Sequence, residues 1–94
     1  QTTKVRGMFV HAKQVAEVVK RFPQISKARL VVTGEMANDQ MQLLVETTET
    51  APGFALQVID ALRDVTKLRG EVQMVAPGSL PNDGKVVEDA RSYQ

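Results

Sequence analysis

A lysine near the end of the chain lies in the setting that most favours chemistry. Lys85 ends the stretch 77–85 (PGSLPNDGK), in which Pro77 and Pro81 alternate with Gly78 and Gly84. Proline stiffens a loop, and glycine permits backbone angles that other residues avoid. An ammonium group with three donors suits a carboxylate or phosphate oxygen that gains charge in a transition state. Lys85 is therefore a candidate catalytic residue, able to reach into a cleft supplied by another domain, although most lysines are simply solvated.

A glycine near the start of the chain is the second candidate. Gly7 interrupts the segment Thr2 to Val10, which is rich in β-branched and apolar residues. Such a segment predicts a short hairpin or a bent strand, with Gly7 where the backbone turns or where another chain approaches closely.

Other chemistries are excluded or weak. The chain has no cysteine and one histidine, His11, so we expect no thiolate or histidine metal site and no Ser-His triad. The stretch 6–10 (RGMFV) faintly resembles the aromatic-bearing strand of an RNA-recognition motif, but the chain has three phenylalanines and one tyrosine, and its net charge is +1. Because nucleic-acid binding domains carry a large basic excess and exposed stacking aromatics, we expect no nucleic-acid partner.

The elements that would position Lys85 and Gly7 follow from hydrophobic periodicity. Apolar residues at helical spacing predict helices over about 12–21 and from 52 to about 67. Alternation predicts strands at 27–33, 40–47 and 69–76, with a polar connection at 34–39. The segment 77–85 is a loop, and the charged tail 86–94 is expected to be a short helix or partly disordered. The order β-α-β-β-α-β, preceded by the hairpin, predicts an α+β fold, a ferredoxin-like two-layer sandwich.

Bulk properties indicate one ordinary globular domain. The chain has 94 residues, of which 43% are hydrophobic and 24% charged. No apolar run approaches the length of a membrane span, so we expect no membrane partner and a cytoplasmic location. The chain starts at Gln1 rather than methionine, which is consistent with a piece of a longer protein.

Two motifs together resemble a known family. The stretch 77–85, followed by Asp89 and Arg91, resembles the closing motif of adenylate-forming enzymes in the version found in phenylacetate–CoA ligases. The stretch 4–11 (KVRGMFVH) resembles the motif that follows the hinge between the two domains of these enzymes. The distance between the motifs and the order of the intervening elements also resemble the small C-terminal domain, so the resemblance covers essentially the whole chain.

The resemblance implies a two-step reaction with ATP (with Mg²⁺) and coenzyme A as substrates of the full enzyme. A carboxylic acid attacks the α-phosphate of ATP, and coenzyme A thiol then attacks the acyl-adenylate. It implies that Lys85, positioned by Pro81 and Gly84, serves the first step, and that the hairpin with Arg6, Gly7 and Met8 lines the pantetheine channel in the second. The partner would be an N-terminal adenylating domain of the same chain, and the isolated fragment would be inactive.

The sequence leaves the acid substrate, an alternative function and the oligomeric state open. The acid substrate, an aryl acid such as phenylacetate by resemblance, would bind in the adenylating domain and cannot be read from this chain. The same element order also occurs in regulatory modules, so a stand-alone domain that binds a small ligand is the alternative function. An isolated domain with uncovered apolar surface could also form a homodimer.

Overall fold

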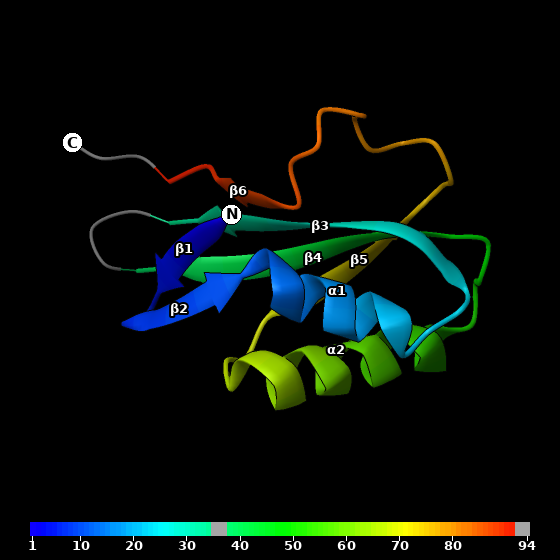
Figure 1. Ribbon diagram of the computed structural model, residues 1–94. Helices are drawn as coiled ribbons and strands as arrows, with labels where there is room; N and C mark the ends of the chain where they lie inside the picture. The colour runs from blue at the N-terminus through cyan, green and yellow to red at the C-terminus, as the bar shows by residue number, and fades with distance from the viewer. Residues whose placement is uncertain (35–37, 92–94) are drawn as a thin grey trace.

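A computed structural model describes residues 1–34 and 38–91 and shows two layers, a sheet and a pair of helices (Figure 1). The elements over these residues are β1 (Thr2–Val5), β2 (Met8–His11), α1 (Ala12–Lys20), β3 (Ile25–Thr33), β4 (Gln40–Thr47), α2 (Pro52–Thr66), β5 (Glu71–Val75) and β6 (Val87–Asp89). Helices α1 and α2 lie together on one face of the sheet formed by β3 to β6. The two-layer α+β class predicted from the sequence is confirmed.

Local chemistry explains where the helices begin and end. The side chain of Gln14 accepts a hydrogen bond from the His11 N–H at 2.8 Å, which satisfies a donor at the start of α1. Pro52 occupies the first turn of α2, where a missing N–H costs nothing. Lys67 ends α2 in the left-handed conformation, with φ of 63°, and its N–H donates to the Arg63 carbonyl. The predicted helix boundaries therefore hold to within a residue at each end.

The main sheet has the strand order β5-β4-β3-β6. Strands β3 and β4 form an antiparallel hairpin, while β5 is parallel to β4 and β6 is parallel to β3. Leu30 pairs with Leu43, and Val72 and Val87 continue that row to the two edges. Leu30 and Leu43 are fully buried, so this row runs through the centre of the core.

The helix layer closes the core. Phe22 and Phe54 meet edge to face, with ring centroids 5.6 Å apart. Val15, Val18 and Val58 are also buried in the same apolar cluster. Burial of these side chains is the main source of stability for the domain.

The prediction of a short helix or partial disorder was wrong for the described part of the tail, residues 86–91. The predicted first strand also differs from that of a ferredoxin-like fold, because it does not join the main sheet. Residues 87–89 form strand β6, which takes the place beside β3, while β1 and β2 form a separate two-stranded sheet. Strand β6 is too short to show a periodic pattern. It forms because β3 offers a free edge: the Leu30 N–H donates to the Val86 carbonyl at 2.7 Å, and the Ala90 N–H donates to Val32 at 2.8 Å. The element order from β2 to β5 is as predicted. Part of the predicted connection 34–39 and positions 92–94 of the tail lie outside the described residues.

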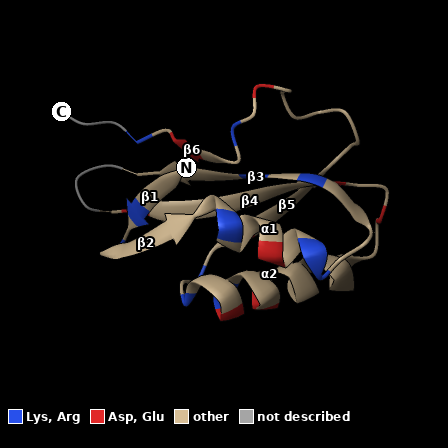
Figure 2. Cartoon of the chain, viewed as in Figure 1, with Lys and Arg blue, Asp and Glu red and all other residues tan. Residues whose placement is uncertain are grey.

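The loop between β5 and β6 crosses the side of the sheet that the helices leave uncovered (Figure 1). Acidic and basic residues are interspersed over both layers in the view of Figure 2, in keeping with the net charge of +1. No helix within residues 1–34 and 38–91 is long and apolar enough to cross a membrane.

Candidate functional site

Lys85 lies near the end of the β5–β6 loop with its side chain exposed. Its backbone N–H donates to Asp83 Oδ1 at 3.0 Å, and Gly84 between them adopts a φ of 75°. Within residues 1–34 and 38–91, Lys85 Nζ has no hydrogen-bond or ion-pair partner. A shallow surface pocket beside it is lined by Lys27, Ala28, Asn82, Gly84, Lys85 and Val86. The ammonium group is therefore available to another molecule or domain.

A buried carboxylate fixes the start of the loop. Glu46 on β4 is 5% exposed, and its two oxygens accept hydrogen bonds from the N–H groups of Gly78 (2.8 Å) and Leu80 (2.9 Å). These two N–H groups hold the pKa of Glu46 below its ordinary value. The Leu80 side chain is itself buried, so this end of the loop has both a polar and an apolar attachment.

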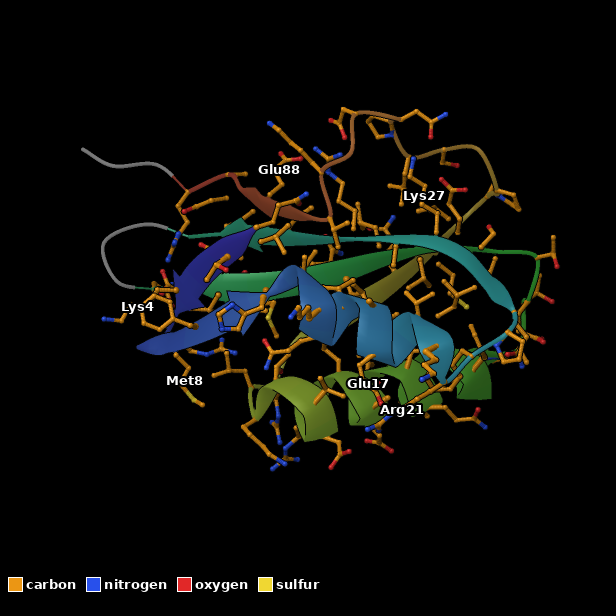
Figure 3. All side chains as sticks on the ribbon, in the orientation of Figure 1. Lys4, Met8, Glu17, Arg21, Lys27 and Glu88 are labelled. Carbon is orange, nitrogen blue, oxygen red and sulfur yellow. The ribbon has the colours of Figure 1, made fainter. Side chains whose placement is uncertain are left out.

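A lysine and an arginine on β3 hold the middle of the loop. Lys27 Nζ donates to the Pro81 carbonyl at 2.6 Å and to Asn82 Oδ1 at 2.7 Å. Arg29 donates from its Nη1 atom to both carboxylate oxygens of Asp83, at 2.9 and 3.1 Å. Figure 3 shows Lys27 on the side of β3 that the loop crosses.

Arg29 also binds the strand that follows the loop. Its Nε donates to Glu88 Oε1 at 2.9 Å, and its Nη2 donates a further hydrogen bond to the same oxygen. The bonds to Glu88 and then to Asp83 raise the pKa of Arg29. The pKa of Asp83 is lowered, first by the Lys85 N–H and then by Arg29. Charge-assisted bonds of this kind fix geometry more firmly than neutral ones.

The first residue of the chain secures the end of the loop. The Gln1 side chain donates to the Gly84 carbonyl at 2.7 Å and accepts from the N–H groups of Val86 and Val87, the latter at 3.0 Å. The Gln1 carbonyl in turn accepts from the Ala12 N–H at 2.9 Å. The residues on both sides of Lys85 are thus hydrogen-bonded to the fold.

The predicted hairpin exists, and Gly7 lies in its turn. Val5 pairs with Met8, and the two turn residues, Arg6 and Gly7, have φ of 47° and 83°. Two consecutive positive φ angles define a type I′ turn, which matches the twist of the strands. An ideal Cβ built on Gly7 would meet no atom of the described residues within 4 Å, so the turn faces open space.

Arg6 attaches the hairpin to the main sheet. Its N–H donates to Asp39 Oδ2 at 2.8 Å, and its guanidinium donates to the carbonyls of Asp39 (3.1 Å) and Arg69. The Arg6 N–H and then Arg91 lower the pKa of Asp39. Arg91 also donates to the Lys4 carbonyl at 2.6 Å. Arg6, predicted to line the pantetheine channel, therefore already has internal partners.

Exposed apolar side chains follow the turn. Met8 is 42% exposed and Phe9 is 61% exposed, and Lys4 Nζ lies 5.7 Å from the centre of the Phe9 ring. Met8 extends away from the body of the domain in Figure 3. Phe9 was not among the candidate site residues named from the sequence, although an aromatic residue two positions after a turn glycine was a usable signal.

The structure does not bring Gly7 and Lys85 together. Gly84 binds Gln1 at the open end of the hairpin, whereas Gly7 forms the closed end. The two candidates therefore belong to two separate parts of the surface. In the part of the chain that the structure describes, no group of three His, Cys, Asp or Glu side chains is placed to hold a metal ion.

The similarity of this chain to known proteins lies in its fold. No family model matches the chain, and no curated protein matches it. Solved structures do match, and the shared architecture is a small α+β domain that recurs inside larger ligases.

The matching structures include domains of two CoA ligases. A domain of phenylacetate-coenzyme A ligase from Bacteroides vulgatus aligns with a TM-score of 0.85 and 20% identity, over 100% of this chain and 96% of that one. The 2-hydroxyisobutyryl-CoA ligase in complex with 2-HIB-AMP and CoA, in its thioesterification state, aligns with a TM-score of 0.83 and 24% identity. The same ligase in a postadenylation state gives a TM-score of 0.77. The alignment to its thioesterification state covers 97% of this chain but 21% of the ligase, so the chain spans about a fifth of that enzyme. The chain therefore has the fold of this ligase domain.

Proposed function

We propose that this chain is the mobile C-terminal domain of an AMP-forming acid–CoA ligase and that Lys85 is its adenylation lysine. The proposal rests on one observation above all. An exposed lysine without a partner in the described residues ends a loop that Glu46, Lys27, Arg29 and Gln1 fasten to the fold. Similarity to the ligase domains over the whole chain supports the same proposal.

The chemistry assigned to Lys85 is electrostatic. In adenylation a carboxylate oxygen of the acid bonds to the α-phosphorus of ATP, and the bond to pyrophosphate breaks. The ammonium group of Lys85 would donate to the carboxylate and to the nucleotide, holding them in line and stabilising the charge that develops. Lys85 takes no proton from the acid, which is already ionised at neutral pH.

The remaining parts of the nucleotide site would come from elsewhere. The N-terminal adenylating domain of the same protein would bind ATP and the acid. Mg²⁺ that accompanies ATP would be held there as well, because the described residues of this chain gather no metal-ligand set. Pro81 and Gly84 would act only through the shape of the loop that carries Lys85.

The hairpin would serve the second step, in which the thiol of coenzyme A attacks the acyl carbon and AMP leaves. The open space at Gly7 would let the pantetheine arm pass close to the backbone, and exposed Met8 would contact its apolar part. Arg6 would support the turn through Asp39. Since Gly7 and Lys85 lie on separate surfaces, the domain would rotate between the two steps.

Phenylacetate or a related aryl acid is the substrate that we propose. The resemblance of the closing motif and the name of one structural neighbour support it. The test of this choice is a panel of acids offered to the full-length protein. An aryl acid should give the highest kcat/KM, and preference for a short aliphatic acid would contradict the choice.

The adenylation role can be tested by ATP–pyrophosphate exchange with the full-length protein. Lys85→Ala should lower the exchange rate by about 10²–10³-fold, the usual effect of removing one electrostatic donor. Lys20→Ala, at an exposed helical lysine, is the matched control and should leave the rate unchanged. Thioester formation from supplied acyl-adenylate should survive Lys85→Ala, and an equal loss in both half-reactions would contradict the assignment.

The 94-residue chain alone should show no exchange, because it lacks the nucleotide site. If the full-length protein also shows none with any acid, the alternative of a regulatory module that binds a small ligand gains support.

A further inference from the structure

Arg29 is a buried cation on the sheet face that the β5–β6 loop crosses, opposite α1 and α2. Its side chain is 8% exposed, yet it contacts two carboxylates that belong to the loop and to the strand after it. Asp83 precedes Lys85 by two residues, and Glu88 follows it by three. Arg29 therefore forms ion pairs with both ends of the segment 83–88, which contains Lys85.

Stability alone is a weak reason for such a cluster. Desolvation of Arg29 offsets part of the energy gained from its two ion pairs, and solvent weakens both pairs because the Asp83 and Glu88 side chains are 40% and 36% exposed. Charged groups of this kind are better suited to fixing one geometry. The guanidinium is a planar fork whose donors point in set directions, so it can bind two carboxylates at once, which a lysine does less well.

The base of the cluster is rigid. Arg29 lies on β3, which is hydrogen-bonded to β4 on one side and to β6 on the other. Asp83 links Arg29 to Lys85, because its Oδ1 accepts a hydrogen bond from Arg29 Nη1 at 2.9 Å and another from the Lys85 N–H at 3.0 Å. This shared oxygen therefore holds the Lys85 N–H, and with it the backbone from which the Lys85 side chain leaves.

We propose that Arg29 is a positioning residue for Lys85, acting through Asp83. This inference rests on the function proposed above. It assigns Arg29 no contact with a substrate. Its effect is to hold the Lys85 backbone in the conformation from which the ammonium group can reach a neighbouring active site.

The first test uses the 94-residue chain and needs no activity. Hydrogen exchange of the Lys85 amide should accelerate on the order of tenfold in Arg29→Met, because its acceptor loses the group that fixes it. The amide of Lys67, which donates to the Arg63 carbonyl on the helix layer, should exchange at the wild-type rate. Arg21→Met, at an arginine that bridges Glu17 and Asp64 on the helix layer, is the control. Unchanged exchange at Lys85 in Arg29→Met would overturn the inference.

The second test uses the full-length protein and both half-reactions. Arg29→Met and Asp83→Asn should each lower ATP–pyrophosphate exchange by about 10–100-fold, the scale expected for a small misplacement of a catalytic group. Thioester formation from supplied acyl-adenylate should not change. The double variant should be no worse than the more damaging single variant, because both remove one constraint. The Asp83 side chain is 40% exposed, so Asp83→Asn tests the idea even if Arg29→Met folds poorly.

The outcomes separate this inference from the proposed function. If Lys85→Ala abolishes exchange but Arg29→Met matches Arg21→Met, the positioning role is wrong and the function stands. If Lys85→Ala has no effect, both fail. Equal losses in the two half-reactions, or fully additive losses in the double variant, would show a general structural role and overturn the inference.

Discussion

Substitutions at Gly7 can distinguish two effects on stability: the strain of a positive φ angle and the steric fit of a side chain in front of the turn. Gly7 has φ of 83°, a region that costs an L-residue about 1–2 kcal/mol. No atom of the described residues lies within 4 Å of an ideal Cβ at this position, so side-chain size should add little to that cost. Gly7→Ala and Gly7→Trp should therefore destabilise the domain by nearly the same amount.

The magnitude can be measured by thermal unfolding of the 94-residue chain. A cost of about 1–2 kcal/mol corresponds to a fall in Tm of about 4–16 °C for a domain of this size. Gly7→Asn should cost less, because asparagine tolerates the left-handed conformation. If Gly7→Trp unfolds far below Gly7→Ala, the turn does not face open space and the reasoning fails.

The same variants test the pantetheine assignment in the full-length protein. Gly7→Trp should lower thioester formation from supplied acyl-adenylate on the order of tenfold or more relative to Gly7→Ala, because only the indole fills the space in front of the turn. ATP–pyrophosphate exchange should be similar in the two variants. Equal rates of thioester formation would show that nothing passes close to Gly7.

Two further predictions concern stability. In urea titrations, Leu30→Ala at the centre of the core should lower the free energy of unfolding by about 3 kcal/mol. Leu56→Ala, at a side chain that is 64% exposed, should change the free energy of unfolding by less than about 0.5 kcal/mol. Similar losses in the two variants would show that the core lies elsewhere. Glu46→Gln leaves one N–H of Gly78 or Leu80 facing an amide donor, so the variant should be less stable at neutral pH. Because the pKa of Glu46 is lowered in the folded chain, the stabilisation from its carboxylate is complete above the ordinary pKa of 4.5 and is lost as the pH falls through the folded-state pKa. If the difference in stability between the wild type and Glu46→Gln stays constant down to pH 2, this account is wrong.

The buried charges on the sheet show what sequence reasoning missed. Arg29 interrupts an apolar run in one predicted strand (ARLVV), and Glu46 directly follows an apolar run in the next (LLVET). A charged residue in or directly after such a run signals a paired or capping group, because an unpaired buried charge is very costly. The sequence could therefore have marked both residues, but not their partners. The loop and strand groups that contact Arg29 lie 54 and 59 positions further along the chain.

Local signals determined most of the elements. The helix stripes around Val15 and Val58 depend only on neighbours three and four residues apart, and the Arg6–Gly7 turn depends on two adjacent residues. Proline and glycine at 77–85 likewise mark a loop that ends in Lys85 without reference to the rest of the chain. These features were readable because their causes lie within one or two turns of backbone.

The tertiary structure decided everything that depends on distant groups meeting. The strand 87–89 exists because β3 has a free edge, and the Lys85 loop is held by Glu46, Arg29 and Gln1, which reach it from other elements. Such contacts depend on how the layers pack, and no periodic pattern records them. The sequence alone thus indicated Lys85 as the candidate residue, and the packing of the sheet decided which groups hold the loop around it.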